Sequence, residues 1–144
     1  MRKILPLNRF CVFDLIEISK AMDNELSEEQ ATQFCSDTPG RLVYGLYDEN
    51  TLISVAVVNL ISVMPNRARW VPNGRIFYIS TLFTLPDYRD QGCASALLKA
   101  IEADATMLST DIIRADSECG KVFQKNGYVE KQPLGYVKQV GGQV

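Results

Sequence analysis

The chain has 144 residues, of which 47% are hydrophobic and 22% charged, and its formal net charge is −2. This composition excludes a disordered chain, the size suits one domain over residues 1–144, and no apolar stretch approaches the roughly 18 residues of a membrane span. The slightly acidic balance argues against nucleic acid as a partner, so we expect neither a membrane nor a nucleic acid to be bound.

The cysteines and the lack of histidine limit the possible chemistry. Met1–Pro6 lacks the apolar core and cleavage site of a signal peptide, so we expect a cytoplasmic protein. Its four cysteines form no C-x-x-C pair, and free thiols are expected rather than metal ligands or disulfides. With no histidine in the chain, Ser-His-Asp and Cys-His catalysis are excluded, and we expect no metal. Chemistry must then come from carboxylates, tyrosines, thiols, backbone amides or a bound cofactor.

The first half of the chain predicts a strand, two helices and a hairpin. Asn8 is placed to cap the first helix, with Phe10, Phe13 and Ile18 turned inward. Ser27–Gln30 has the pattern of a capping box, which marks the start of the second helix. The predicted bounds are a strand over Lys3–Leu7, helices from Asn8 to about Met22 and from Ser27 to the turn at Asp37–Gly40, and strands over Arg41–Tyr47 and Thr51–Ile61.

The second half predicts a strand, a helix, a short strand, a short helix and a final hairpin. Before them lies a long connection, Met64–Gly74, which contains Trp70 and could be an acceptor lid, an interface or an anchored surface loop. Asn126 and Gly127 supply a left-handed stop for the last helix. The predicted bounds are strands over Arg75–Leu85, Asp111–Ala115, Tyr128–Lys131 and Tyr136–Val140, and helices from Gly92 to about Met107 and from Asp116 or Ser117 to Lys125.

The most informative stretch is Ile79–Leu98, where an apolar strand breaks at Pro86 and a short polar loop leads into an amphipathic helix. A loop with Arg89 and Gly92 at a helix start presents several unpaired N–H groups, and the helix dipole adds positive potential. Glycine suits a backbone that approaches phosphate closely, and the small Ala94 is tolerated at the next such position. The stretch therefore predicts a diphosphate site.

The pattern Arg89-x-x-Gly92-x-Ala94 after a strand resembles the pyrophosphate loop (R/Q-x-x-G-x-G/A) of the GCN5-related N-acetyltransferases, the GNAT family. The segment from Val122 to Tyr128 resembles that family's F-Y-E-K-L-G-F, and the order of elements agrees over nearly the whole chain. The resemblance implies an α/β fold with a mixed central sheet of about seven strands and four helices. In that fold the fourth and fifth strands splay apart.

The resemblance also implies acetyl-CoA as co-substrate. The fourth strand would pair with the pantetheine arm as with an added strand, and the loop would wrap the pyrophosphate. Three positions depart from the family pattern, because Asp90 replaces Gly or Lys, Asp116 replaces an Asn, and Phe123 replaces the tyrosine of the second motif. The implied cofactor-binding residues are Leu82, Phe83, Thr84, Arg89, Asp90, Gln91, Gly92, Cys93, Ala94, Ser95, Asp116 and Phe123.

In the implied reaction a neutral amine attacks the acetyl thioester directly, and a backbone amide near Leu82 or Phe83 polarises the carbonyl. The leaving thiolate is usually protonated by the motif's tyrosine, and Phe123 cannot donate a proton. Three alternatives stay open. Water or another tyrosine, Tyr78 or Tyr128, serves as donor; Cys119 is an acidified thiol; or the protein binds acetyl-CoA with little turnover.

The general base and the acceptor depend on the acidic residues. Asp111 aligns with a carboxylate position used by some family members, with Glu118 and the acidic second helix as alternatives. Five acids and no base lie between Ala21 and Gly40, in the helices that line the acceptor side in the family. They favour a cationic acceptor such as a lysine side chain, a free N-terminus or a polyamine.

The sequence thus predicts transfer of an acetyl group from acetyl-CoA to a primary amine. The alternative is a catalytically weak or inactive GNAT-fold protein that binds CoA and acts in regulation or interaction. Pairing of the last strands at the sheet edge, or docking through the loop with Trp70, would make a homodimer.

Overall fold

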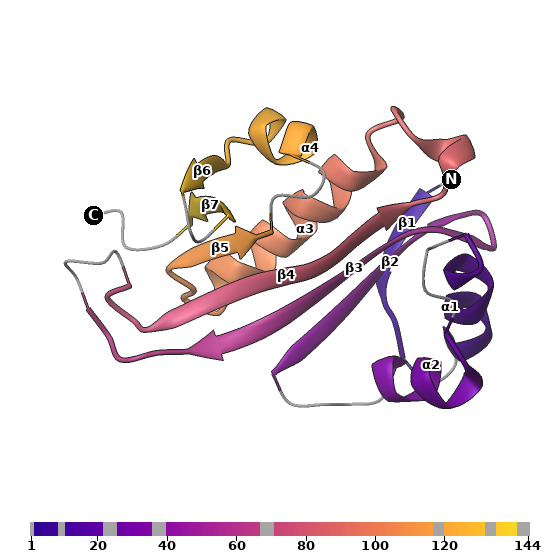
Figure 1. Cartoon of the computed structure of the whole chain (residues 1–144), viewed down its shortest axis with the longest axis horizontal. Helices are drawn as coiled ribbons and strands as arrows, with labels where there is room; N and C mark the ends of the chain where they lie inside the picture. Colours follow the sequence, from indigo (N-terminus) through magenta and orange to yellow (C-terminus); the bar gives the residue numbers. More distant parts are fainter. Residues whose placement is uncertain are drawn as a thin grey trace. The chain divides into compact units, whose positions relative to one another are not determined.

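The computed structural model describes residues 2–8, 11–21, 26–35, 40–66, 71–116, 120–131 and 135–140. Across these ranges it has four α-helices and one seven-stranded sheet with the strand order β1-β2-β3-β4-β5-β7-β6 (Figure 1). This confirms the predicted mixed sheet and helix number. The chain divides into two compact units, Met1–Val57 with Thr81–Leu97, and Val58–Ser80 with Leu98–Val144.

The first unit contains β1 (Arg2–Pro6), β2 (Arg41–Asp48) and most of β3 (Thr51–Ser62), with α1 (Val12–Ser19) and α2 (Glu28–Cys35). β1 pairs antiparallel with β2, and α1 lies against α2 (Figure 1). Apolar side chains of α1, α2, β2 and β3 form one core, which includes Leu15, Ile18, Ala31, Val43 and Val55.

The helix starts were predicted with mixed success. At α2 the capping box is confirmed, because Gln30 N donates to Ser27 Oγ at 3.2 Å and Ser27 N donates to Gln30 Oε1 at 2.9 Å. The first helix starts later than predicted, since its N-cap is Cys11 and no side chain caps it. Its buried face is therefore made by Val12, Leu15, Ile18 and Ser19.

This shift explains an error in the predicted core. Ile18 is buried as expected, but Phe13 is 70% exposed, so its inward placement was wrong. Phe13 lies one residue beyond Val12, about 100° further around a helix of 3.6 residues per turn, and so leaves the buried stripe. Phe10 and Met22 lie outside the described residues.

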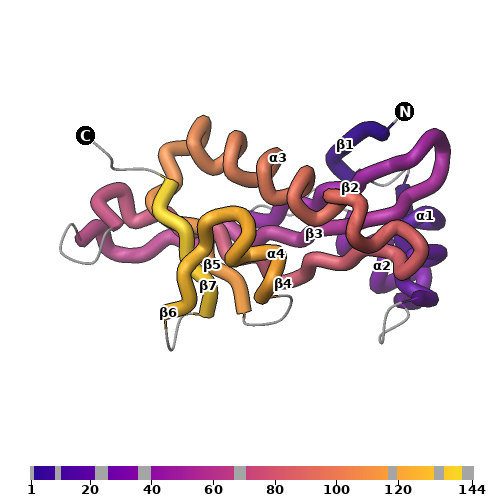
Figure 2. The backbone as a smooth tube through the Cα atoms, turned by 90° about the horizontal axis from the view of Figure 1, so that it is seen from above, coloured from indigo at the N-terminus to yellow at the C-terminus, as the bar shows by residue number. Residues whose placement is uncertain are grey.

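The second unit holds the first part of β4 (Arg75–Thr84), most of α3 (Cys93–Met107), and then β5 (Ile112–Ala115), α4 (Gly120–Lys125), β6 (Val129–Lys131) and β7 (Gly135–Gln139). β5 pairs parallel with β4 and antiparallel with β7, which also pairs with β6 (Figure 2). The strand bounds agree with the predicted ones to within one or two residues.

Between two backbone hydrogen bonds that join them, the segment with β4 has one residue more than the opposite segment with β3. Val63 N donates to Gly74 O at 2.8 Å, and Leu85 N donates to Ile53 O at 2.9 Å. Between these two bonds the chain advances ten residues on the β3 side, from Ile53 to Val63, but eleven on the β4 side, from Gly74 to Leu85. β4 therefore carries a bulge.

Two side-chain contacts locate the bulge. Asn59 Nδ2 donates to Ser80 Oγ at 3.1 Å, and Ser54 Oγ lies 2.8 Å from Thr84 Oγ1, so each pair shares a sheet face. Ser54 and Asn59 are five residues apart, so on a regular β3 their side chains lie on opposite faces of the sheet. Ser80 and Thr84 are four residues apart and would lie on the same face if β4 were regular, which conflicts with their partners on β3. The extra residue therefore lies between Ser80 and Thr84.

None of the helices in the described ranges is long and apolar enough to cross a membrane.

Candidate functional site

The bulge sets the direction of the peptide groups at the end of β4. Because Leu85 N bonds to Ile53 O on β3, strand alternation also turns the peptide groups of Phe83 toward β3. Those of Thr84, which lies beyond the bulge, then point toward the opposite edge. The described register of β4 with β5 ends earlier, at Ile79.

The end of β4 is held by polar contacts within the first unit. Buried Ser54 donates through Oγ to Phe83 O at 2.8 Å. Arg89 Nε donates to Thr84 O at 3.1 Å, and its guanidinium carbon lies 5.7 Å from the Phe83 ring centroid. Arg89 itself is exposed, so its remaining N–H groups face solvent beside the strand end.

The loop that follows turns sharply into α3. After the 3-10 turn η3 (Pro86–Tyr88), Asp90 has φ 63° and Gly92 has φ 80°, both in the left-handed region. Ala96 N donates to Gly92 O at 3.0 Å and closes the first helical bond. The N–H groups of residues 93 and 94 therefore precede the helical ladder and point out of the helix start.

The space in front of this helix start is open. A Cβ added at Gly92 would meet no atom within 4 Å. Several backbone N–H groups and the positive end of the α3 dipole thus face an accessible space, which is the arrangement that binds phosphate.

Sequence reasoning missed Arg2, which ties β1 to the loop. Its guanidinium donates to Gln91 Oε1 and, at 3.5 Å, to Cys93 Sγ, and its carbon lies 5.9 Å from the Tyr88 ring centroid. Its Nε also lies 3.9 Å from a carboxylate oxygen of Asp48. No local pattern marks Arg2, because only the pairing of β1 with β2 brings it here.

In the second unit, Asp111 has the surroundings of a structural carboxylate rather than those predicted for a general base. Its side chain is fully buried and accepts the backbone N–H of Asn73 at 3.1 Å and that of Arg75 at 3.0 Å. It therefore holds the turn that leads into β4. Asp111 and Asp116 lie at opposite ends of β5, roughly 16 Å apart for an extended strand.

Asp116, at the C-terminal end of β5, forms the more exposed carboxylate site. Tyr78 Oη donates to Asp116 Oδ2 at 2.5 Å, and the Arg114 guanidinium carbon lies 4.7 Å from the Tyr78 ring centroid. Tyr78 and Arg114 are register partners on β4 and β5. The structure thus joins Tyr78 and Asp116, which the sequence assigned to different roles.

Phe123 lies in a cluster of aromatic rings. It is buried on α4, its ring stacks on Tyr136 with centroids 5.7 Å apart, and it meets Tyr128 edge-on at 5.3 Å. Its environment is that of a core side chain at the position of the family's tyrosine.

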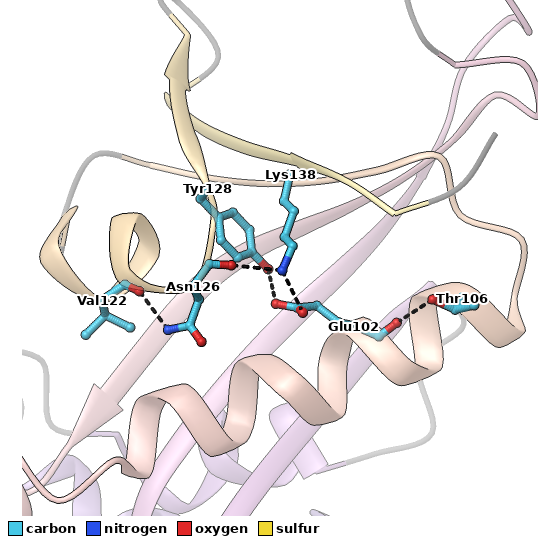
Figure 3. Close-up of polar contacts among 6 residues, drawn as sticks. All are labelled: Glu102, Thr106, Val122, Asn126, Tyr128 and Lys138. Carbon is cyan, nitrogen blue, oxygen red and sulfur yellow. Dashed lines mark hydrogen bonds and ion pairs between the residues drawn. The ribbon is translucent and has the colours of Figure 1, made fainter. Parts of the chain in front are cut away.

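The Tyr128 hydroxyl, a predicted proton donor, is already used. It donates to Glu102 Oε2 at 3.2 Å, and Lys138 Nζ donates to Glu102 Oε1 at 3.0 Å and to Asn126 O at 2.8 Å. Figure 3 shows Tyr128 and Lys138 both pointing toward Glu102 on α3. Burial, and then the Glu102 carboxylate, raise the pKa of Tyr128. A buried hydroxyl bound to a carboxylate is suited to holding the fold together.

Other predicted features remain outside the described residues, namely Cys119, Glu118, Trp70 and the acids Asp23, Glu25 and Asp37. The remaining two acids of the run, Glu28 and Glu29, are exposed in the first turn of α2. Within the described parts of the chain, no group of three or more His, Cys, Asp or Glu side chains is placed to hold a metal ion.

Solved structures similar to this chain share its fold. A predicted acetyltransferase from Clostridium acetobutylicum, determined with acetyl-CoA, is 17% identical, with 93% of this chain and 94% of that chain covered and a TM-score of 0.75. NAA60 from Arabidopsis thaliana, in complex with acetyl-CoA, is 12% identical, with 99% and 100% covered and a TM-score of 0.78. An aminoglycoside antibiotic 6'-N-acetyltransferase from Acinetobacter baumannii is 18% identical, with 99% and 100% covered and a TM-score of 0.75.

The comparison of sequences gives the family. A search of curated proteins gave no match. A family model described as an acetyltransferase (GNAT) domain matches residues 16–141, which is most of the chain. Together with the seven-stranded sheet and four helices, this match shows that the chain belongs to the GNAT family of acetyltransferases.

Proposed function

We propose that the chain is an N-acetyltransferase that moves an acetyl group from acetyl-CoA to a primary amine by direct attack. The observation that supports this most is the turn at Asp90 and Gly92, which aims the first N–H groups of α3 at open space. A diphosphate fits such a site, and acetyl-CoA carries one. Two of the structurally similar proteins were determined with acetyl-CoA.

In this proposal β4 supplies the thioester site. The peptide groups of Leu82 and Thr84 would pair with the pantetheine arm as with an added strand. The N–H of Leu82 would polarise the acetyl carbonyl as negative charge develops on its oxygen. The peptide groups of Phe83 face β3, and its carbonyl accepts the Ser54 hydroxyl. Phe83 would therefore contact the cofactor through its ring and hold the end of β4 through its carbonyl.

For the general base we propose Asp116 acting with Tyr78, in place of Asp111. The short bond between Tyr78 Oη and Asp116 Oδ2 gives a path by which a proton from the attacking amine reaches a carboxylate. Asp111 is fully buried and bonded to two backbone N–H groups, so it has no oxygen aimed at an acceptor.

A cationic amine is the acceptor class that the charges favour. Glu28 and Glu29 are exposed on α2, in the part of the chain that lines the acceptor side in the family. Binding of a basic peptide should therefore weaken as salt rises, because exposed charges are screened over about 8–10 Å at physiological ionic strength. Salt-insensitive binding would rule out this acceptor class.

The test combines binding and transfer. Calorimetry measures acetyl-CoA binding, and mass spectrometry then follows acetyl transfer to a panel of amines, because a thiol-detecting dye would react with the protein's own cysteines. Gly92→Ala should weaken acetyl-CoA binding at least tenfold, since the added Cβ strains a left-handed residue and fills the phosphate approach.

Gly127→Ala is the matched control. Gly127 also has positive φ, at 89°, and an added Cβ there would meet only the Lys138 side chain. This variant should carry similar backbone strain but bind acetyl-CoA like the wild type. Equal weakening by both variants would contradict a phosphate site at Gly92.

A second candidate function is a CoA-binding regulatory or interaction protein with little turnover. Phe123 favours it, because the usual proton donor is replaced by a buried ring. Tight acetyl-CoA binding with no transfer to any amine would establish this second function and exclude the first.

A further inference from the structure

In the second unit, the sheet at β4 and β5 has one apolar face and one polar face. The apolar face is made by buried side chains, namely Phe77, Ile79, Ile113 and Ala115. The side chains that alternate with them are half-buried or exposed, namely Tyr78, Ser80, Arg114 and Asp116. Because successive side chains of a strand point to opposite faces, this second set shares one face. A small molecule can therefore reach the polar face from solvent.

Contacts between the polar side chains confirm that they share this face. The Arg114 guanidinium carbon lies 4.7 Å from the ring centroid of Tyr78, whose hydroxyl donates to Asp116. The face continues onto the neighbouring β3, where Asn59 Nδ2 donates to Ser80 Oγ at 3.1 Å. Three adjacent strands thus present a cation, a carboxylate and several hydrogen-bonding groups together.

The cation and the carboxylate contact different parts of one phenol. Arg114 lies over the ring of Tyr78, whereas Asp116 accepts from its hydroxyl. A guanidinium has five N–H donors, so contact of its central carbon with a ring is compatible with donation from its edge to a carboxylate. A ligand that contacts both charged groups would carry a positive group for Asp116 and a negative group for Arg114.

We propose that the acceptor is an amine that also carries a carboxylate, as a free amino acid does, and that Arg114 binds this carboxylate. The inference rests on the proposed acetyl transfer with Asp116 as general base, and it narrows the acceptor class, since a polyamine has no group for Arg114. The amine nitrogen forms the bond to the acetyl carbon and gives one proton through Tyr78 to Asp116. The carbon–sulfur bond breaks with its electron pair on sulfur, and solvent protonates the thiolate.

The first test compares free amino acids with their own α-amides as acceptors, by mass spectrometry of the acetylated products. The amide keeps the amine and the side chain but has no negative charge. For the best amino acid, kcat/KM should exceed that of its amide at least tenfold, because a guanidinium forms strong charge-assisted hydrogen bonds to a carboxylate. Equal values within every pair, or transfer to polyamines and peptides but to no amino acid, would overturn the proposal.

Arg114→Gln removes the cation and tests whether it binds the carboxylate. It should lower kcat/KM for the amino acid at least tenfold, mainly through a higher KM, and should change kcat/KM for the amide less than twofold. An equal fall for both acceptors would show that Arg114 acts only through Tyr78 and Asp116, and would overturn its role as a carboxylate ligand.

Two further variants separate the guanidinium from charge in general. Arg114→Lys keeps the charge but loses the planar fork, so its preference for the amino acid should lie between those of the wild type and Arg114→Gln. Lys99→Gln, at an exposed position of α3, removes one charge elsewhere and should behave like the wild type. An equal loss of preference in Lys99→Gln would contradict a specific site. Circular dichroism melting checks folding, and the comparison of acceptors with the wild type decides if a variant is unfolded.

The outcomes separate the two proposals. A wild type that acetylates amines without preferring those with a carboxylate would overturn the role of Arg114 and leave the acetyltransferase proposal standing. A wild type that binds acetyl-CoA but acetylates neither amines nor amino acids would overturn both.

Discussion

At the scale of single residues, the two carboxylates that flank the short strand β5 have opposite surroundings. Asp111 is fully buried and bonded to backbone N–H groups at the N-terminal end of β5, whereas Asp116 is exposed at its C-terminal end and accepts from Tyr78. A charged oxygen that satisfies buried donors stabilises the fold, and an exposed one beside a phenol can exchange protons.

Substitution of each by asparagine separates these roles. Asp111→Asn should lower the free energy of unfolding by about 1–3 kcal/mol, since one side-chain oxygen is lost to two backbone donors, and urea titration measures it. Asp116→Asn should lower kcat/KM at least tenfold with an unchanged unfolding midpoint. The opposite pattern would restore Asp111 as the general base.

A buried thiol adds a dependence of stability on pH. Burial, with the nearby Cys11 next in size, raises the pKa of Cys35 from 9.0 to about 11. Because the folded pKa is above the unfolded one, the contribution of Cys35 to stability is complete below pH 9.0 and is lost as pH rises toward about 11.

Unfolding free energies measured from pH 8 to pH 11 should therefore decrease in the wild type and decrease less steeply in Cys35→Ala. Identical slopes would show that Cys35 is not the responsible group. The raised pKa values of Tyr47 and Tyr128, both due first to burial, act in the same direction at higher pH.

At the scale of elements, the N-terminal strand supports the loop before α3. Arg2 on β1 contacts Gln91, Cys93 and Tyr88, so pairing of β1 with β2 fixes the loop that presents the helix start. The loop has two residues with left-handed backbone, Asp90 and Gly92, and Arg2 adds contacts to those within the loop.

Arg2→Ala should raise the KM for acetyl-CoA several-fold with a smaller change in kcat, because the amides that we propose bind phosphate lose their support while the proposed thioester site on β4 is unchanged. Steady-state kinetics at saturating amine measures both constants. Lys3→Ala, on the next and exposed position of β1, is the control and should behave like the wild type. Equal effects of the two changes would indicate a general loss of positive charge.

A polar network joins α3 to the last two strands in the second unit. Glu102 accepts hydrogen bonds from Tyr128 and Lys138 (Figure 3). The side chain of Glu102 is 20% exposed and that of Lys138 is 30% exposed. Partly buried charges of this kind are costly when one partner is removed.

Glu102→Gln should therefore lower the unfolding free energy by about 1.5–3 kcal/mol, the contribution of hydrogen bonds to a charged group. Glu130→Gln, on exposed β6, is the matched control and should change it by less than about 0.5 kcal/mol. Urea unfolding of both variants measures these free energies. An equal effect of Glu102→Gln and Glu130→Gln would show that the network has no net effect on stability.

At the scale of the whole molecule, the sequence predicted the features that local patterns encode. The strands, the helices and the loop at Gly92 follow from periodicity, capping residues and a glycine-containing loop, whereas the mixed sheet was implied by the resemblance to the GNAT family. Arg2 was not assigned a role, because its contacts with the loop before α3 depend on the pairing of β1 with β2. The structural contacts of Asp111 could not be predicted for the same reason, since its backbone donors come from the start of β4 and the turn before it.

The most direct test of acetyl transfer is mass spectrometry with isotopically labelled acetyl-CoA and a panel of lysine peptides, free N-termini and polyamines. We predict that at least one amine gains the labelled acetyl group, at a rate proportional to the concentration of the wild-type protein. Gly92→Ala should require a higher acetyl-CoA concentration to reach the same rate. Saturable acetyl-CoA binding without a labelled product on any amine would contradict the proposed function.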